Sequence, residues 1–204
     1  MRKLFDYLLC PFAMRTRIVL KEKNLPFDRI LLDLPNKEQK EEWYLALNPY
    51  GKVPVLVEEG AWVYESSLCN EYLEDKYPSP PLAPTAPAEK ARMRLWVNWC
   101  NSQFVPPVLS LLYENRKPAE ERSQEKIDHT KAKLVALFPN LEQQLRSRDY
   151  LMGAYSVADI AFTPFLALCE RVGVDFRGFP QVVQWAQRLK TRASYEEVKI
   201  GFPA

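Results

Sequence analysis

Hydrophobic and polar positions over the first thirty residues predict a βαβ unit. Residues 3–9 form an apolar, strand-like run. Residues 12–23 place apolar side chains at Ala13, Ile18 and Val19, which is typical of a helix with one buried face. Residues 27–32 return to a strand-like pattern, so the helix is expected to connect two strands.

The next segments predict a hairpin and a closing helix. Residues 37–47 are polar and are expected to be irregular or helical. Residues 53–57 and 61–64 read as two strands, with Glu58, Glu59 and Gly60 at the turn. A helix is expected to follow over residues 66–76.

Five prolines then fall within residues 78–87, a density that excludes regular helix and predicts a stiff linker. Beyond it the apolar spacing is helical throughout. The predicted fold class is α/β followed by all-α: an N-terminal domain over 1–77, a proline-rich linker over 78–87 and a helical domain over 88–204. The helices expected in that last domain are 88–115, 118–148, 157–171 and 180–192.

Two local signals stand out within the helical part. Ser156 and Asp159 have the spacing of a capping box, with aspartate in place of glutamate, and losing either is expected to cost about 1 kcal/mol. Pro106 and Pro107 are expected to kink or break the first long helix. Both predictions concern structure rather than chemistry.

Charge and composition exclude several classes of function. A net charge of +2 spread over mixed-sign helices gives no footprint for nucleic acid. No segment approaches the length of a membrane span, and the N-terminus does not resemble a secretory signal. The four cysteines are far apart in the sequence and the chain has one histidine, so no metal site is expected. Widely spaced cysteines are also typical of a reducing compartment, so the protein is expected in the cytoplasm.

Candidate chemistry begins at Cys10, where a strand-like run gives way to a helix. Pro11 suits the first helical position, so Cys10 would lie at the N-cap. The unpaired amides and positive helix dipole would favour the thiolate and lower the thiol pKa. The alternative is a buried, inert cysteine, because free cysteines are among the most buried residues.

Two further segments could bind a peptide-like ligand. If the Val53–Pro54 bond is cis, Val53 would present its backbone N–H and C=O to an extended ligand; an ordinary trans proline is the alternative. Glu65 and Ser66, at a helix start, could hold an ammonium and a carboxylate together; a simple helix cap is the alternative.

Taken in order, these motifs resemble the cytosolic glutathione transferase superfamily. The resemblance covers essentially the whole chain and rests on CPFAMRTRIVL at 10–20, NPYGKVPVL at 48–56, ESSLCNEYLEDKYP at 65–78 and SVADIA at 156–161. It implies a thioredoxin-like N-terminal domain and a helical C-terminal domain. The CPFA sequence is similar to that of the omega and related cysteine-type classes.

The resemblance also implies roles for individual residues. Cys10 matches the cysteine that forms a mixed disulfide with glutathione. Val53 matches the backbone that binds the cysteinyl part, and Pro54 the cis-proline behind it. The remaining residues expected to bind glutathione are Phe12, which lines the pocket, Lys37, near the glycyl carboxylate, and Glu65 and Ser66, which bind the γ-glutamyl group.

The expected function is a glutathione-dependent thiol transferase that acts on a small disulfide or electrophilic substrate. The expected reactions are thiol–disulfide exchange, deglutathionylation or dehydroascorbate-type reduction, with weak conjugating activity. Glutathione is the expected cosubstrate, and the family implies a homodimer. Trp96, Trp99, Gln103, Phe104, Pro106 and Tyr113 are possible substrate contacts, although aromatic residues at helical spacing are more often core. The alternative function is a non-enzymatic module that binds RNA polymerase, as in the similar stringent starvation protein A.

Overall fold

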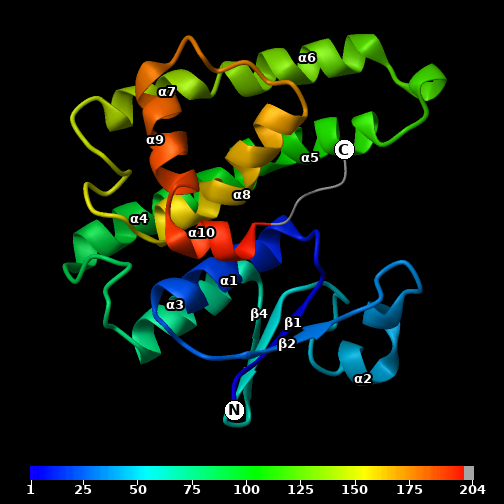
Figure 1. The fold of residues 1–204 in the computed structure, drawn as a ribbon, viewed down its shortest axis with the longest axis vertical. Coiled ribbons are helices and arrows are strands. Elements are labelled where there is room, and N and C mark those ends of the chain that lie inside the picture. The colour runs from blue at the N-terminus through cyan, green and yellow to red at the C-terminus, as the bar shows by residue number, and fades with distance from the viewer. Residues whose placement is uncertain (200–204) are drawn as a thin grey trace. The chain divides into compact units, whose positions relative to one another are not determined.

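The computed structural model describes residues 1–199 (Figure 1). They divide into two compact units, which are described separately below: residues 1–82 together with 192–199, and residues 83–191. In this part of the chain no helix has both the length and the apolar character needed to cross a bilayer.

A four-stranded mixed sheet forms the centre of the first unit (Figure 1). Its strand order is β2-β1-β3-β4, with β1 parallel to β2 and antiparallel to β3. This is the thioredoxin-like arrangement that the family resemblance implies. The strands are β1 (Lys3–Asp6), β2 (Asp28–Leu31), β3 (Val55–Glu58) and β4 (Ala61–Tyr64).

The predicted hairpin is confirmed, with a two-residue turn. Glu58 pairs with Ala61, and both Glu59 (φ 52°) and Gly60 (φ 84°) have positive φ angles. Two consecutive positive φ angles are typical of a type I′ turn, whose twist matches that of the flanking strands.

Two helices of the first unit, α1 (Pro11–Glu22) and α3 (Ser66–Lys76), pack against each other. Pro11 occupies the first position of α1, as predicted. The polar stretch between β2 and β3 forms a 3₁₀ turn, Glu38–Lys40, and the short helix α2 (Glu42–Leu45).

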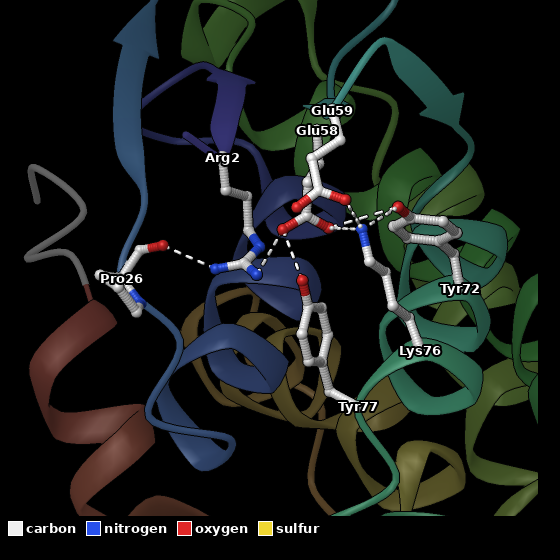
Figure 2. Close-up of polar contacts among 7 residues, drawn as sticks. All are labelled: Arg2, Pro26, Glu58, Glu59, Tyr72, Lys76 and Tyr77. Carbon is white, nitrogen blue, oxygen red and sulfur yellow. Dashed lines mark hydrogen bonds and ion pairs between the residues drawn. The ribbon is translucent and has the colours of Figure 1, made fainter.

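A buried carboxylate links the start of β1 to the end of α3 (Figure 2). Glu58 is 5% exposed and accepts hydrogen bonds from Arg2, Lys76 and Tyr77. The Arg2 guanidinium also lies 4.9 Å from the centroid of the Tyr77 ring. These contacts connect two segments that are far apart in sequence.

The structure divides the chain differently from the expected boundaries at 77, 87 and 88. Glu74 accepts hydrogen bonds from the Leu82 amide, and Lys23 donates to the carbonyls of Tyr77 and Pro80. The first half of the expected linker therefore belongs to the first unit.

The C-terminal boundary also differs, because helix α10 (Ala193–Val198) was not predicted and packs on α1 in the first unit. Arg192 and Ser194 bind the carboxylate of Glu22. The Val198 carbonyl accepts a hydrogen bond from Arg17 at 3.5 Å. Six residues carry too little periodicity to reveal a helix that depends on such distant partners.

The helical second unit is confirmed: among its described residues the regular elements are helices, apart from one isolated bridge between Met152 and Ala154. The expected helix over 88–115 contains a π-helical stretch, Cys100–Phe104, just before Pro106 and Pro107. This is where the missing proline N–H groups interrupt the α-helical ladder. The expected helix over 118–148 is divided in two. The helices are α4 (Pro87–Trp99), α5 (Val105–Asn115), α6 (Gln124–Val135), α7 (Phe138–Leu145), α8 (Val157–Arg171) and α9 (Pro180–Lys190).

The capping box at α8 is confirmed. The Ser156 hydroxyl accepts from the Ala158 amide, and Asp159 accepts from the Ser156 amide at 3.0 Å. Asp159 is fully buried and also accepts from the Leu151 amide and the Trp185 indole. The cap is thus part of the core of the second unit.

Candidate active site

Cys10 lies in the segment that joins β1 to α1, immediately before the first helical residue. Its amide donates to the Tyr7 carbonyl at 2.9 Å, and its sulfur lies 3.8 Å from the Val53 carbonyl oxygen. All four cysteines are free thiols, and Cys10 alone among them is partly exposed. The fold therefore leaves one accessible thiol, next to Val53.

The prediction that the start of the helix lowers the pKa of the Cys10 thiol is wrong for the protein without a ligand. Burial raises the pKa of the Cys10 thiol from its ordinary value of 9.0 to about 11. The backbone amides of Ala13 and Phe12 favour the thiolate, but their effect is smaller than that of burial. At neutral pH the sulfur is therefore a thiol, because the protein packed around it solvates a thiolate less well than water does.

The loop that carries Val53 is held firmly in place. Its Val53–Pro54 bond is cis, as the resemblance implies. Tyr44 Oη and Asn48 Nδ2 each donate to the Lys52 carbonyl at 2.8 Å. No described residue accepts a hydrogen bond from the Val53 amide, which leaves this donor available to a ligand.

Gly51 allows the same loop to approach the backbone of Gln39 closely. Its φ is +57°, and a Cβ at this position would lie 2.5 Å from the Gln39 carbonyl oxygen. Only glycine adopts this conformation without a steric penalty. The glycine of the NPYGKVP motif is therefore required by the backbone geometry.

Glu65 and Ser66 lie at the start of α3, as expected. Glu65 is exposed and has a φ of 67° and a ψ of 117°, a conformation that residues other than glycine rarely adopt. Ser66 is 4% exposed and is the first residue of the helix. A carboxylate thus sits beside the amide-rich end of a helix, which attracts anions.

Phe12 and Ser66 are connected by Arg15, a residue that the sequence analysis did not single out. The Arg15 guanidinium carbon lies 5.3 Å from the centroid of the Phe12 ring, and Nη1 lies 3.4 Å from Ser66 Oγ. An arginine on the apolar side of a predicted helix was the available signal, because such a charge needs a specific partner.

Lys37 stands apart from the other expected site residues. It is exposed and has a left-handed conformation (φ 63°) at the start of the 3₁₀ turn. Within residues 1–199, no hydrogen bond or ion pair joins its side chain to the other six expected site residues. Its place in the site stays a prediction.

The possible substrate contacts in the helical unit differ in character. Phe104 is fully buried and packs on Phe138 and Phe162, so it belongs to the core. Trp96, Trp99 and Gln103 line a hollow between α4 and α7, whereas Tyr113 is 59% exposed. The structure therefore removes Phe104 from the possible contacts.

Two family models match the chain: Glutathione S-transferase, N-terminal domain, over residues 9–76, and Glutathione S-transferase, C-terminal domain, over residues 104–193. The sequence is also 30% identical over 202 residues to glutathione S-transferase F10 of Arabidopsis thaliana, with 93% of each chain covered. The chain belongs to the glutathione S-transferase family.

Other members of the glutathione S-transferase family give the same result. Glutathione S-transferase GstB of Escherichia coli (strain K12) is 30% identical over 185 residues, which cover 89% of each chain. The crystal structure of poplar glutathione transferase F1 matches with a TM-score of 0.89 and 27% identity, over 97% of this chain and 95% of that one. The fold class predicted from the sequence is confirmed.

Proposed function

We propose that this chain is a cysteine-type, omega-like glutathione transferase that reduces disulfides by thiol–disulfide exchange at Cys10. The observation that carries the proposal is the position of Cys10: a partly exposed thiol at a helix start, 3.8 Å from the Val53 carbonyl. Ala13 stands where a dithiol protein would have its second cysteine, so a second glutathione must complete the cycle.

Each expected site residue has a place in the proposed complex. Val53 pairs through its backbone with the cysteinyl part of glutathione, and Pro54 fixes that backbone. Ser66 and the amides at the start of α3 bind the γ-glutamyl carboxylate, while Glu65 binds the ammonium. Phe12 lines the pocket, and Lys37 is assigned to the glycyl carboxylate.

The proposed reaction proceeds in two balanced steps. The Cys10 thiol first loses its proton to solvent, and the resulting thiolate attacks the glutathione sulfur of a mixed disulfide. The S–S bond of the mixed disulfide breaks, and the substrate leaves as a thiolate that takes up a proton from solvent. A second glutathione thiolate then attacks the Cys10 mixed disulfide and releases glutathione disulfide. The net change converts one mixed disulfide and one glutathione into one thiol and one glutathione disulfide.

Relatives named as glutathione transferases, and one of the same fold solved with glutathione, support this proposal. The sequence is 45% identical over 82 residues to the protein named glutathione S-transferase DHAR3, chloroplastic, of Arabidopsis thaliana. Those residues make up 40% of this chain and 30% of that protein. Ure2p, solved in complex with glutathione, has the same fold (TM-score 0.88, 21% identity). Relatives that match about nine-tenths of this chain are named as glutathione transferases. Their names favour the enzyme over the polymerase-binding alternative.

Conjugation is a second candidate, favoured by the raised pKa of the Cys10 thiol. A protonated Cys10 donates a weak S–H hydrogen bond, which would stabilise the thiolate of bound glutathione while that thiolate attacks an electrophile. In this reaction the Cys10 sulfur forms no covalent bond. The two candidates therefore differ in whether Cys10 becomes bonded to glutathione.

Exposure to oxidised glutathione, followed by intact-mass measurement, tests the proposal. We expect one glutathione adduct on the wild type and on Cys169→Ala, which removes a buried thiol, and none on Cys10→Ser. An unmodified wild type that still conjugates glutathione to an electrophile would support the second candidate. An adduct that persists in Cys10→Ser would exclude Cys10 as the nucleophile.

A further inference from the structure

Arg15 is a charged side chain in the interior of the first unit, with only 1% of its surface exposed. Its guanidinium lies over the Phe12 ring and within hydrogen-bond distance of Ser66 Oγ. Phe12 belongs to the first turn of α1 and Ser66 to the first turn of α3. One buried cation therefore contacts two side chains that are expected to bind the same ligand.

The contact determines how the Ser66 hydroxyl is used. A guanidinium donates hydrogen bonds and cannot accept them, so Ser66 Oγ must be the acceptor in this pair. The Ser66 hydrogen is then directed away from Arg15. A hydroxyl that accepts from a cation is also a better donor, because the cation draws electron density from its oxygen.

We infer that Arg15 is a positioning residue that orients the Ser66 hydroxyl as a donor to the α-carboxylate of the γ-glutamyl group. This inference rests on the proposed function. The Arg15 charge adds to the positive end of α3, where the Ser66 and Ser67 amides have no intrahelical acceptor.

Arg2 provides a matched control in the same unit (Figure 2). It is also buried, lies over an aromatic ring and contacts a side-chain oxygen, that of Glu58. Its partners are at the end of β3 and just after α3, whereas Ser66 is at the start of α3. An eleven-residue helix is roughly 16 Å long, so the two arginines act at opposite ends of it.

Binding of S-methylglutathione, measured by calorimetry, tests the inference without requiring turnover. We expect Arg15→Gln to bind about tenfold more weakly than wild type, because a charge-assisted contact is lost. Arg2→Gln should be less stable but bind within about twofold of wild type. In steady-state kinetics Arg15→Gln should raise the KM for glutathione more than it lowers kcat.

A double-mutant cycle identifies the route of the effect. If Arg15 acts through Ser66, then Arg15→Gln in a Ser66→Ala background should weaken binding by less than about twofold. A glutathione analogue whose γ-glutamyl α-carboxylate is an amide should bind wild type and Arg15→Gln almost equally. Arg15→Lys keeps the charge but not the planar guanidinium, so its affinity for S-methylglutathione should lie between those of wild type and Arg15→Gln. If Arg15→Gln does not fold, the affinity of Arg15→Lys tests the inference in its place.

The outcomes separate the inference from the proposed function. A wild type that does not bind S-methylglutathione overturns the proposed function. A wild type that binds while Arg15→Gln and Arg15→Lys bind equally well overturns the role of Arg15 alone. Additive effects of the Arg15 and Ser66 substitutions would show that Arg15 does not act through Ser66.

Discussion

The indole N–H of Trp185 donates a 2.9 Å hydrogen bond to Oδ1 of Asp159, 26 residues earlier in the chain. The same carboxylate accepts from the amides of Leu151 and Ser156 and from the Ser156 hydroxyl. Burial raises the pKa of Asp159 to about 6, against the effect of these donors. A residue expected to be only a helix cap thus joins α8, α9 and the preceding loop.

We therefore expect the two cap residues to differ in their effect on stability. Ser156→Ala should lower the free energy of unfolding by about 1 kcal/mol, as for an ordinary cap. Asp159→Ala should cost about 3 kcal/mol or more, because it leaves several buried donors unpaired. Urea unfolding checks both, with the exposed cap Ser123→Ala as a control. Equal costs at 156 and 159 would contradict this account.

The pH dependence of Cys10 alkylation follows from its raised pKa. Without added glutathione, the rate constant for iodoacetamide should increase about tenfold per pH unit from pH 7 to 10, since the thiolate fraction grows until the pH reaches about 11. Mass analysis in the Cys10→Ser variant corrects for the buried thiols. A rate that levels off below pH 8 would show a lowered pKa instead.

Glu65 is expected to lower the stability of the protein and to strengthen the binding of glutathione. Its φ of 67° is unfavourable for a side chain with a Cβ, so Glu65→Gly should raise the free energy of unfolding by about 1 kcal/mol. The same change removes the carboxylate assigned to the ligand ammonium and should weaken S-methylglutathione binding about tenfold. Glu65→Ala is the control, since it should weaken binding without removing the cost of the positive φ angle. A Glu65→Gly variant that binds like wild type would contradict the assignment.

Gly51 and Gly60 make a matched pair of left-handed glycines. Gly51→Ala should destabilise the first unit by about 3 kcal/mol, because its Cβ would meet the backbone oxygen of Gln39. It should also weaken glutathione binding, because Gly51 lies two residues before Val53 in the same loop. Gly60→Ala meets no atom within 4 Å and should cost about 1 kcal/mol, with binding unchanged. Thermal unfolding and calorimetry measure both effects. Similar losses at the two positions would argue against the close approach at Gly51.

Local sequence signals determined most of the secondary structure. The apolar, strand-like runs that became β1 and β3, the turn at Glu59 and Gly60, and the cap at Ser156 act over a few residues, so composition and spacing suffice to predict them. The order of the motifs around Cys10, Val53 and Ser66 was enough to indicate the family. These features depend on neighbours in the chain, which a sequence displays directly.

Tertiary structure decided the properties that depend on distant neighbours. Burial set the direction of the Cys10 pKa, against the local expectation from the helix start. Packing on α1 assigned α10 to the first unit, and Arg15 gained its contact with Ser66 only when α1 and α3 met. Desolvation and long-range hydrogen bonds arise from residues far apart in sequence, so no window of the chain contains them.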